Sequence, residues 1–262
     1  METNEWNVLS PVESREGVFF KREDQQRVGE VVGGKGMEGG AIIASRIFAG
    51  KLVNGLTTAV DTSTTHMELI ARLARHYKLP CRIHITAKMF GQPVLIAKEL
   101  GAKLVIHKNK SLPSMIDASK GDVRKEGYFY IPGGMAEWVA IRRTREQTAN
   151  IPDEVTRVIV PVQTGITLCG VLHGLRDSSR KNVLVEGVRL GGDPQAALEK
   201  FAPTGFEEHF TWRAPNNQYT DEKDAVLHGI QLDPVTTWKC RSHVQANTLL
   251  WLTELRSQVK RI

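Results

Sequence analysis

Lys35 is the first side chain whose surroundings suggest chemistry, because it lies between two glycine pairs, Gly33-Gly34 and Gly39-Gly40. Glycine has no Cβ, so such pairs let the backbone come close to a partner, at a cost in conformational entropy on folding. An apolar run with helical spacing, AIIASRIFA at 41–49, follows. The stretch therefore predicts a lysine that approaches something closely, with a helical run after it.

A second candidate site is the turn in VIVPVQTGIT at 158–167, where a buried strand ends and a helix opens. Backbone N–H groups of such a turn, together with the helix N-terminus, form an anion pocket. The hydroxyls of Thr164 and Thr167 could add donors. A plain strand-to-helix turn capped by a threonine explains the same residues, and this stretch taken alone favours that reading.

A third candidate is the hydroxyl-rich turn in VDTSTTHMELI at 60–70. It holds Thr62, Ser63, Thr64 and Thr65, and one of these is explained as a helix cap, whereas four exceed what capping needs. His66 is expected to be exposed in the first helical turn rather than to act as a ligand.

The segment GIQLDPVTTWKC at 229–240 reads by itself as an ordinary loop. Its Asp-Pro pair predicts a turn, and Thr236 and Thr237 are expected to follow in extended structure.

The elements that must position these turns alternate between strands and helices. Such alternation is typical of βαβ units and a parallel sheet, here in two sheet segments. Strands are predicted at 56–61, 81–86, 103–108, 128–134, 156–162 and 181–188, and helices at 64–78, 91–101, 135–150 and 168–178.

The remaining stretches are less regular. Residues 1–18 read as an irregular lead-in, 109–127 as a looser stretch, and 189–232 lose clear periodicity except for a short helix at 221–229. The run HVQANTLLWLTELRSQ at 243–258 predicts a closing helix, with Leu249, Leu250, Leu252 and Leu255 as its apolar residues.

The composition is that of an ordinary globular protein, with 262 residues, 41% apolar and 24% charged. Its three cysteines form no CxxC pair, which suggests neither a disulfide framework nor a zinc site and makes a reduced cytosolic setting the default. No signal peptide is recognisable, and no apolar run reaches the ~18 residues of a membrane span. A net charge of +6 and a pI near 9.3 leave a polyanionic partner open.

Taken together, the motifs resemble the fold-type II pyridoxal-phosphate-dependent enzymes of the tryptophan synthase β-like superfamily. The branch they resemble most is that of aminocyclopropane-carboxylate deaminase and D-cysteine desulfhydrase, which is marked by the KRED opening and by LDPV followed by a lysine. The matching stretches occur in the family's order: FFKRED at 19–24, GGK at 33–35, DTSTTH at 61–66, IPGG at 131–134, VPVQTGIT at 160–167 and LDPVTTWK at 232–239.

The resemblance covers about 17–190 and 229–245. It implies an α/β protein, a trimmed two-lobed parallel-sheet fold of three α/β/α layers. Residues 1–48 and 136–262 would form the larger cofactor-binding lobe and 49–135 the smaller α/β lobe. A homodimer is expected from the family.

The resemblance makes Lys35 the residue that forms the Schiff base with pyridoxal 5′-phosphate. A buried amine gives up its proton more readily, so it can attack the cofactor aldehyde and later move the substrate α-proton. In this interpretation the glycines let the cofactor ring approach the backbone.

The same resemblance implies the remaining contacts. Thr65 replaces an asparagine at the cofactor 3′-oxygen, and Thr237 would face the pyridine nitrogen. The phosphate would bind Gln163, Thr164, Gly165, Ile166 and Thr167, with Gln163 and Ile166 in place of two glycines. The substrate carboxylate would bind Thr62, Ser63, Thr64, Thr65 and His66.

Two replacements bear on the reaction. The neutral Thr237 resembles the desulfhydrases, whereas the deaminases have a carboxylate there, and a neutral partner favours β-elimination or replacement. Thr236 stands where the branch has an active-site tyrosine, which argues against cyclopropane deamination. The expected function is that of a lyase or deaminase acting on a small amino acid-like substrate.

Two alternatives stay open. A chain shorter than typical members, with 190–228 unmatched, predicts an open cleft. That cleft and a basic surface suit an amino acid attached to a DNA base, as in bacteriophage DNA hypermodification in a host cytoplasm. The approach would be lined by Arg142, Arg143, Arg145, Arg180 and Lys181, for which solvated surface charge is the simpler reading. The replacements at Thr65, Gln163, Ile166 and Thr236 would instead fit a non-catalytic relative, although Lys35 argues against it.

Overall fold

The computed structural model describes residues 3–60, 65–86, 91–178, 180, 182–216, 220 and 224–253. The chain divides into two compact units, the first formed by Met1–Trp6 with Arg27–Glu137 and the second by Asn7–Gln26 with Trp138–Ile262. The predicted lobes differ from these units mainly in their treatment of residues 1–6 and 27–48, which the prediction joined to the C-terminal half. In the structure these residues belong to the first unit, because the helix that follows Gly33 packs on the next helix of the same unit.

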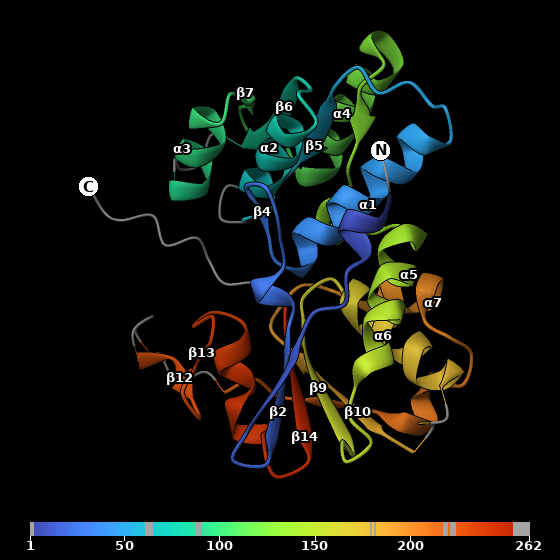
Figure 1. Cartoon of the computed structure of the whole chain (residues 1–262). Coiled ribbons are helices and arrows are strands. Elements are labelled where there is room, and N and C mark those ends of the chain that lie inside the picture. Colours follow the sequence, from blue (N-terminus) through green and yellow to red (C-terminus); the bar gives the residue numbers. More distant parts are fainter. Residues whose placement is uncertain are drawn as a thin grey trace. The chain divides into compact units, whose positions relative to one another are not determined.

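The first unit is built on a four-stranded parallel sheet with the order β7-β6-β5-β8. Helices α2 and α3 cover one face of this sheet and α4 covers the other (Figure 1). A two-stranded antiparallel ribbon, β3-β4, precedes α1. The bounds are β3 Arg27–Val28, β4 Val31–Val32, α1 Gly34–Phe48, β5 Leu56–Ala59, α2 His66–His76, β6 Cys81–Thr86, α3 Gln92–Glu99, β7 Lys103–His107, α4 Leu112–Glu126 and β8 Phe129–Tyr130.

The sequence analysis did not predict α4. The buried residues of α4 are Met115 and Ser119, and since one of these two is polar, the apolar period of the helix is weak. Its end signals were readable, because a proline opens the first turn and Gly127 ends the helix in the left-handed conformation at φ +70°. The other strand and helix predictions for residues 56–108 are confirmed to within a few residues at each end.

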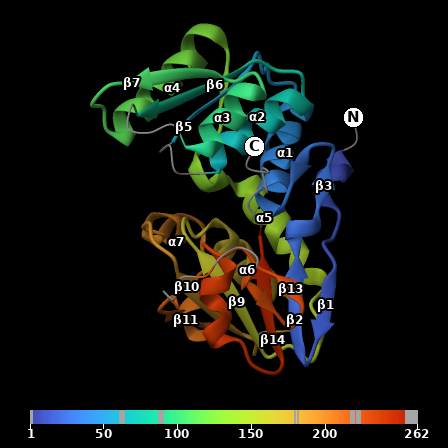
Figure 2. The same ribbon diagram turned by 90° about the vertical axis from the view of Figure 1, so that its left-hand side faces the viewer.

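The second unit is built on a six-stranded sheet with the order β1-β2-β14-β9-β10-β11, in which only β1 and β2 are antiparallel. Figure 2 shows α6 and α7 beside the β9 to β11 part of this sheet. The bounds are β1 Val12–Arg15, β2 Val18–Arg22, α5 Trp138–Glu146, β9 Arg157–Val162, α6 Ile166–Asp177, β10 Leu184–Arg189, α7 Gln195–Phe201, β11 Phe210–Arg213, β12 Val226–Leu227, β13 Ile230–Gln231 and β14 Thr248–Leu252.

The predicted closing helix at 243–258 is wrong over residues 248–252. These residues form β14, which pairs in parallel with both β2 and β9. All five are buried, so the strand is apolar on both faces and shows no alternation. A short apolar run of this kind cannot be told from a buried helix by its period alone. Residues 254–258 of that prediction lie outside the described residues.

Two further predictions of irregular or helical structure are wrong. The lead-in contains the hairpin β1-β2, and the short helix expected at 221–229 is replaced at 226–227 by the first strand of the hairpin β12-β13. The two turns are Glu16-Gly17 and His228-Gly229, and all four of their residues have positive φ. Two-residue turns of this conformation match the twist of the strands that they join.

The KRED motif, residues 21–24, lies inside the second unit. Lys21 Nζ donates to the Ser10 carbonyl oxygen at 2.9 Å, and burial lowers the pKa of Lys21 to about 8. Glu23 accepts from Arg143 Nη1 at 2.8 Å and from Trp251 Nε1 at 2.9 Å. The motif therefore joins β2 to α5 and to β14, which is a structural role. Among the described residues, no helix has the length and apolar character needed to cross a membrane.

Candidate active site

Lys35 lies in the first turn of α1, directly after Gly33, whose φ is +83°, and Gly34. Its amine donates to Glu38 Oε2 at 2.7 Å and to the Gly134 carbonyl oxygen at 3.4 Å. The Lys35 side chain is 19% exposed, whereas that of Glu38 is 1% exposed. The amine thus sits at the edge of the first unit against a buried carboxylate. Sequence analysis missed Glu38, although its position three residues after Lys35 on a helix is a readable signal.

The second glycine pair has a role other than the predicted one. A Cβ on Gly39 would lie 2.6 Å from Leu73 Cδ1, and one on Gly40 would lie 2.0 Å from the Trp6 ring. Both positions face side chains of the same unit, so these glycines serve close packing of α1 and do not leave room for a cofactor ring. Of the two pairs, Gly33 is the one that needs glycine for its backbone conformation.

His66 is buried, so the prediction of an exposed first-turn residue is wrong. It opens α2, and its Nε2 lies 3.3 Å from Thr58 Oγ1 at the end of β5. Because Thr58 donates its own hydrogen to the Ile131 carbonyl oxygen at 2.8 Å, His66 Nε2 must carry the hydrogen between them. Burial, followed by the positive charge of Lys35, lowers the pKa of His66 to about 4, so the ring is neutral near pH 7. Its role with a substrate stays a prediction.

Of the hydroxyl cluster, the structure describes one member. Thr65 precedes α2 and is partly buried, and its carbonyl oxygen accepts from the Leu69 N–H at 3.1 Å. Its side chain makes no capping hydrogen bond. Thr62, Ser63 and Thr64 lie outside the described residues.

The predicted phosphate turn lies in the second unit, at the N-terminus of α6. Gly165 precedes the helix in the left-handed conformation, at φ +83°, and no side chain caps the helix. A Cβ on Gly165 would lie 3.1 Å from Pro194 Cβ, and one on Gly192 would lie 2.9 Å from the Gln163 carbonyl oxygen. Two glycine-dependent turns therefore lie against each other at this helix start.

This helix start fits an anionic group. Its first turn holds no acidic side chain, and the N–H groups of a helix's first turn have no partner within the helix. Gln163 and Thr164 are exposed, whereas Ile166 and Thr167 are buried. The threonine-capped turn considered as the alternative is not what forms, because the capping position is a glycine.

The turn predicted at the Asp-Pro pair is confirmed, whereas the extended structure expected for Thr236 and Thr237 is wrong. Asp233 Oδ1 accepts from the Thr236 N–H at 2.8 Å and from Thr236 Oγ1 at 2.9 Å, and a 3₁₀ helix, Thr237–His243, follows. Thr237 Oγ1 accepts from the Asp233 N–H at 2.9 Å and donates to the Asp233 carbonyl oxygen at 3.4 Å. An aspartate that caps the backbone just after it explains this geometry, and its signal is the Asp-Pro pair itself.

The basic residues predicted to line an approach are mostly in ion pairs. Arg143 is buried and pairs with Glu23, so its assignment to a polyanion-binding surface is wrong. Arg145 pairs with Asp177 at 2.9 Å and Arg180 with Asp153 at 2.8 Å, whereas Arg142 is exposed. Lys181 lies outside the described residues.

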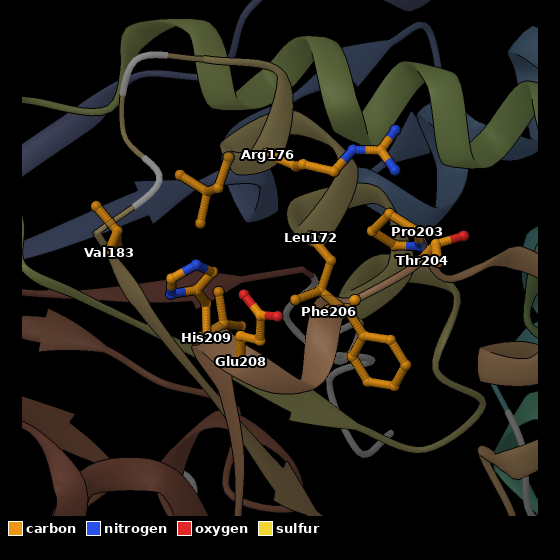
Figure 3. A pocket seen from close by; sticks show the side chains of 11 residues that line it. Leu172, Arg176, Val183, Pro203, Thr204, Phe206, Glu208 and His209 are labelled. Carbon is orange, nitrogen blue, oxygen red and sulfur yellow. The ribbon is translucent and has the colours of Figure 1, made fainter.

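A cavity of about 280 Å³ lies in the second unit between α6, β10 and residues 203–209 (Figure 3). Its walls are mainly apolar, with Leu172 and Val183 among them, and Arg176, Glu208 and His209 add polar groups. It adjoins the C-terminal half of α6, whereas the glycine turn is at the other end of that helix. It contains none of the predicted site residues. Among the described residues, no group of three or more His, Cys, Asp or Glu side chains could hold a metal ion.

Comparison with known proteins agrees with the fold. No curated protein matches the chain. Among solved structures, an ACC deaminase homologue is 17% identical, with a TM-score of 0.71 over 94% of this chain and 89% of its own. Threonine deaminase isoform 2 from Solanum lycopersicum is 16% identical, with a TM-score of 0.70 over 98% and 87%. Diaminopropionate ammonia lyase from Escherichia coli is 14% identical, with a TM-score of 0.66 over 98% and 87%.

At these identities the structural likeness shows the fold alone, and it confirms the predicted α/β, parallel-sheet architecture of the tryptophan synthase β-like type. Family membership comes from the sequence itself. The model of the family described as "PALP: Pyridoxal-phosphate dependent enzyme" matches residues 5–236, which include Lys35, the glycine turn at 163–165 and Asp233. The chain therefore belongs to the pyridoxal-phosphate-dependent enzyme family.

Proposed function

We propose that this chain is a pyridoxal-phosphate-dependent lyase or deaminase that acts on a small amino acid-like substrate, with Lys35 as the residue that binds the cofactor. The observation that carries the proposal is the position of Lys35, whose amine lies in the first turn of α1 beside Glu38. The family match over residues 5–236 supports it. Solved structures of the same fold include deaminases and an ammonia lyase, whose reaction class this proposal adopts, and also racemases.

The chain's own residues have distinct tasks in this proposal. Pyridoxal phosphate, when bound, supplies the electron sink for the substrate carbon next to the amino group. Lys35 Nζ would bind the cofactor aldehyde and would afterwards take and return the substrate α-proton. The first-turn N–H groups of α6 would hold the phosphate, to which a helix terminus contributes about 0.3–1 kcal/mol. As the resemblance implies, Thr237 would serve the pyridine nitrogen and Thr65 the 3′-oxygen.

The decisive experiment identifies the lysine that carries the cofactor. The purified chain is incubated with pyridoxal phosphate, reduced with borohydride and digested, and the modified peptide is sequenced by mass spectrometry. We expect the adduct on Lys35, and Lys35→Ala should lose the visible absorbance of the bound cofactor while keeping its circular dichroism. An adduct on an exposed lysine such as Lys51 in both proteins would refute the assignment.

The phosphate position is tested by a matched pair in one turn. Gly165→Val should weaken pyridoxal phosphate binding strongly, because Gly165 has positive φ and a Cβ there meets Pro194. Gln163→Ala should change it little, because that side chain is exposed. Affinities from absorbance titration that fall equally in both variants would contradict the proposed cradle.

A substrate attached to DNA has less support, because Arg143, Arg145 and Arg180 are in ion pairs. Arg142 is the remaining exposed candidate within the described part of the chain. A DNA-binding titration in salt tests this alternative, for which log K should fall with a slope of about −0.9 per phosphate neutralised. The expected homodimer is likewise a proposal, which light scattering would test.

A further inference from the structure

Glu38 is a buried carboxylate that the proposed function has not yet used. The residue is 0% exposed, and its Oε2 lies 2.7 Å from Lys35 Nζ. Burial of an ionised carboxylate is costly unless the group is paired and hydrogen-bonded. A carboxylate in this position therefore has a strong interaction with the one amine to which the proposed function assigns the chemistry.

The other groups around Lys35 do not compete for its proton. His66 of α2 is neutral near pH 7, since its pKa is lowered to about 4. The 3₁₀ helix Gly133–Met135 contributes the Gly134 carbonyl oxygen and has no titratable side chain, and β4 has none either. Arg27 of β3 is exposed. Of the two described hydrogen-bond partners of the Lys35 amine, Glu38 is thus the one that is ionisable.

The geometry of the pair is held by the helix that carries both residues. They are three positions apart on α1, so their side chains lie on one face of the same helix. The glycines after Glu38 hold α1 tightly against Leu73 and Trp6. A pair fixed in this way can exchange a proton without a change of backbone conformation.

We propose that Glu38 is the positioning residue and proton store of Lys35, an inference that rests on the proposed function. In the resting pair Lys35 is an ammonium and Glu38 a carboxylate. When Lys35 must act as a nucleophile or base, an Nζ–H bond breaks, an Oε2–H bond forms, and the nitrogen keeps the electron pair.

Both charges disappear in the same transfer, so the pair is neutral overall before and after it. The reverse transfer, from Oε2 to Nζ, restores the ammonium and the carboxylate once Lys35 has returned the substrate proton and is again a free amine. Glu38 acts through Lys35 and touches neither substrate nor cofactor in this scheme.

The test measures the reactivity of Lys35 in the cofactor-free full chain. The protein is labelled with a small amount of acetic anhydride between pH 6 and 11, and acetylation of Lys35 is followed by peptide mass spectrometry. In Glu38→Gln the pH of half-maximal labelling should fall, because an opposite charge within hydrogen-bond distance favours the charged form of the amine. Glu38→Asp keeps the charge, so its profile should lie nearer that of the unsubstituted chain.

The matched control is Glu68→Gln in α2. Glu68 is also a largely buried carboxylate in an ion pair, with Arg72 at 2.9 Å, and its removal should leave the Lys35 profile unchanged. Lys98, which is exposed on α3, reports within each digest whether the reagent behaves normally. A Glu38→Gln profile that coincides with that of the unsubstituted chain would overturn the inference.

A second measurement covers the case in which Glu38→Gln does not fold. In Lys35→Met, NMR of ¹³C-labelled glutamate should show Glu38 taking up a proton at higher pH than in the unsubstituted chain. An unchanged Glu38 titration would also overturn the pairing. The proposed function is tested separately by mapping of the borohydride adduct, so an adduct on Lys35 with an unshifted labelling profile would refute the role of Glu38 alone.

Discussion

Acid should destabilise the first unit through His66, and replacement of this residue by Gln separates that effect from general acid unfolding. Burial and the charge of Lys35 lower the pKa of His66 from 6.5 in the unfolded chain to about 4 in the folded one. Above pH 6.5 the ring is neutral in both states and contributes no pH dependence. As the pH falls below 6.5, His66 binds a proton in the unfolded state but not in the folded state, so the free energy of unfolding decreases until about pH 4.

The size of the effect follows from the two pKa values. The whole shift corresponds to about 3 kcal/mol, at 1.36 kcal/mol per pKa unit. About 2 kcal/mol of this is already lost at pH 5, where the unfolded histidine is almost fully protonated and the folded one is still neutral. A loss of this size is a large share of the stability of an ordinary domain.

The assay is urea unfolding at pH 7.5 and at pH 5, for the unsubstituted chain and for His66→Gln. The unsubstituted chain should lose about 2 kcal/mol more than the variant between the two pH values. His209→Gln, an exposed histidine of the second unit, should lose as much as the unsubstituted chain. If His66→Gln shows the same pH dependence as the unsubstituted chain, His66 is not held neutral and the reasoning fails.

Three shorter predictions concern packing and burial. Gly40→Ala should destabilise the chain by about 1–3 kcal/mol, because the new methyl group would overlap the Trp6 ring. Gly121→Ala, on open space in α4, should stabilise it by about 0.5–1 kcal/mol in the same urea assay. Arg143→Met should lower the free energy of unfolding by about 3–5 kcal/mol, because it leaves the buried Glu23 without its ionic partner. Arg145→Ala, which breaks an exposed ion pair, should lower it by under ~1 kcal/mol. Equal losses in the two variants would contradict the difference in burial. Burial raises the pKa of Cys81 to about 12, so iodoacetamide at pH 8 should modify it only after urea is added, and rapid labelling of the native chain would refute this.

The parallel α/β architecture was predictable because its signals are local. Strands such as Cys81–Thr86 and helices such as Ile166–Asp177 differ in apolar period, and Gly165 marks the start of the helix. The strand, the turn and the helix around Gly165 were predictable for the same reason, since they follow one another directly in the chain. Several such stretches occur in the same order as in the pyridoxal-phosphate-dependent enzymes. The match to the model of that family confirms this assignment.

The candidate site was less predictable, because burial and pairing join residues distant in sequence. Nothing near His66 indicates that Thr58 and Ile131 enclose it. Nothing near Arg143 indicates a partner at Glu23, 120 positions earlier. The sequence alone does not distinguish an exposed arginine from a buried one. The packing around the side chain decides whether it is a surface group or part of a structural ion pair.

The sequence by itself determined the helical run at 41–49, which lies within α1, and the turn that begins α6, since both depend on neighbouring residues alone. The tertiary structure decided the conformation of Thr248–Leu252. The apolar residues of this segment would suit a buried helix equally well. The segment becomes a strand because β2 and β9 pair with it through hydrogen bonds, one on each side. Neighbouring residues determine the helices and strands that have a clear apolar period, whereas a central strand is stabilised by partner strands far away in the chain.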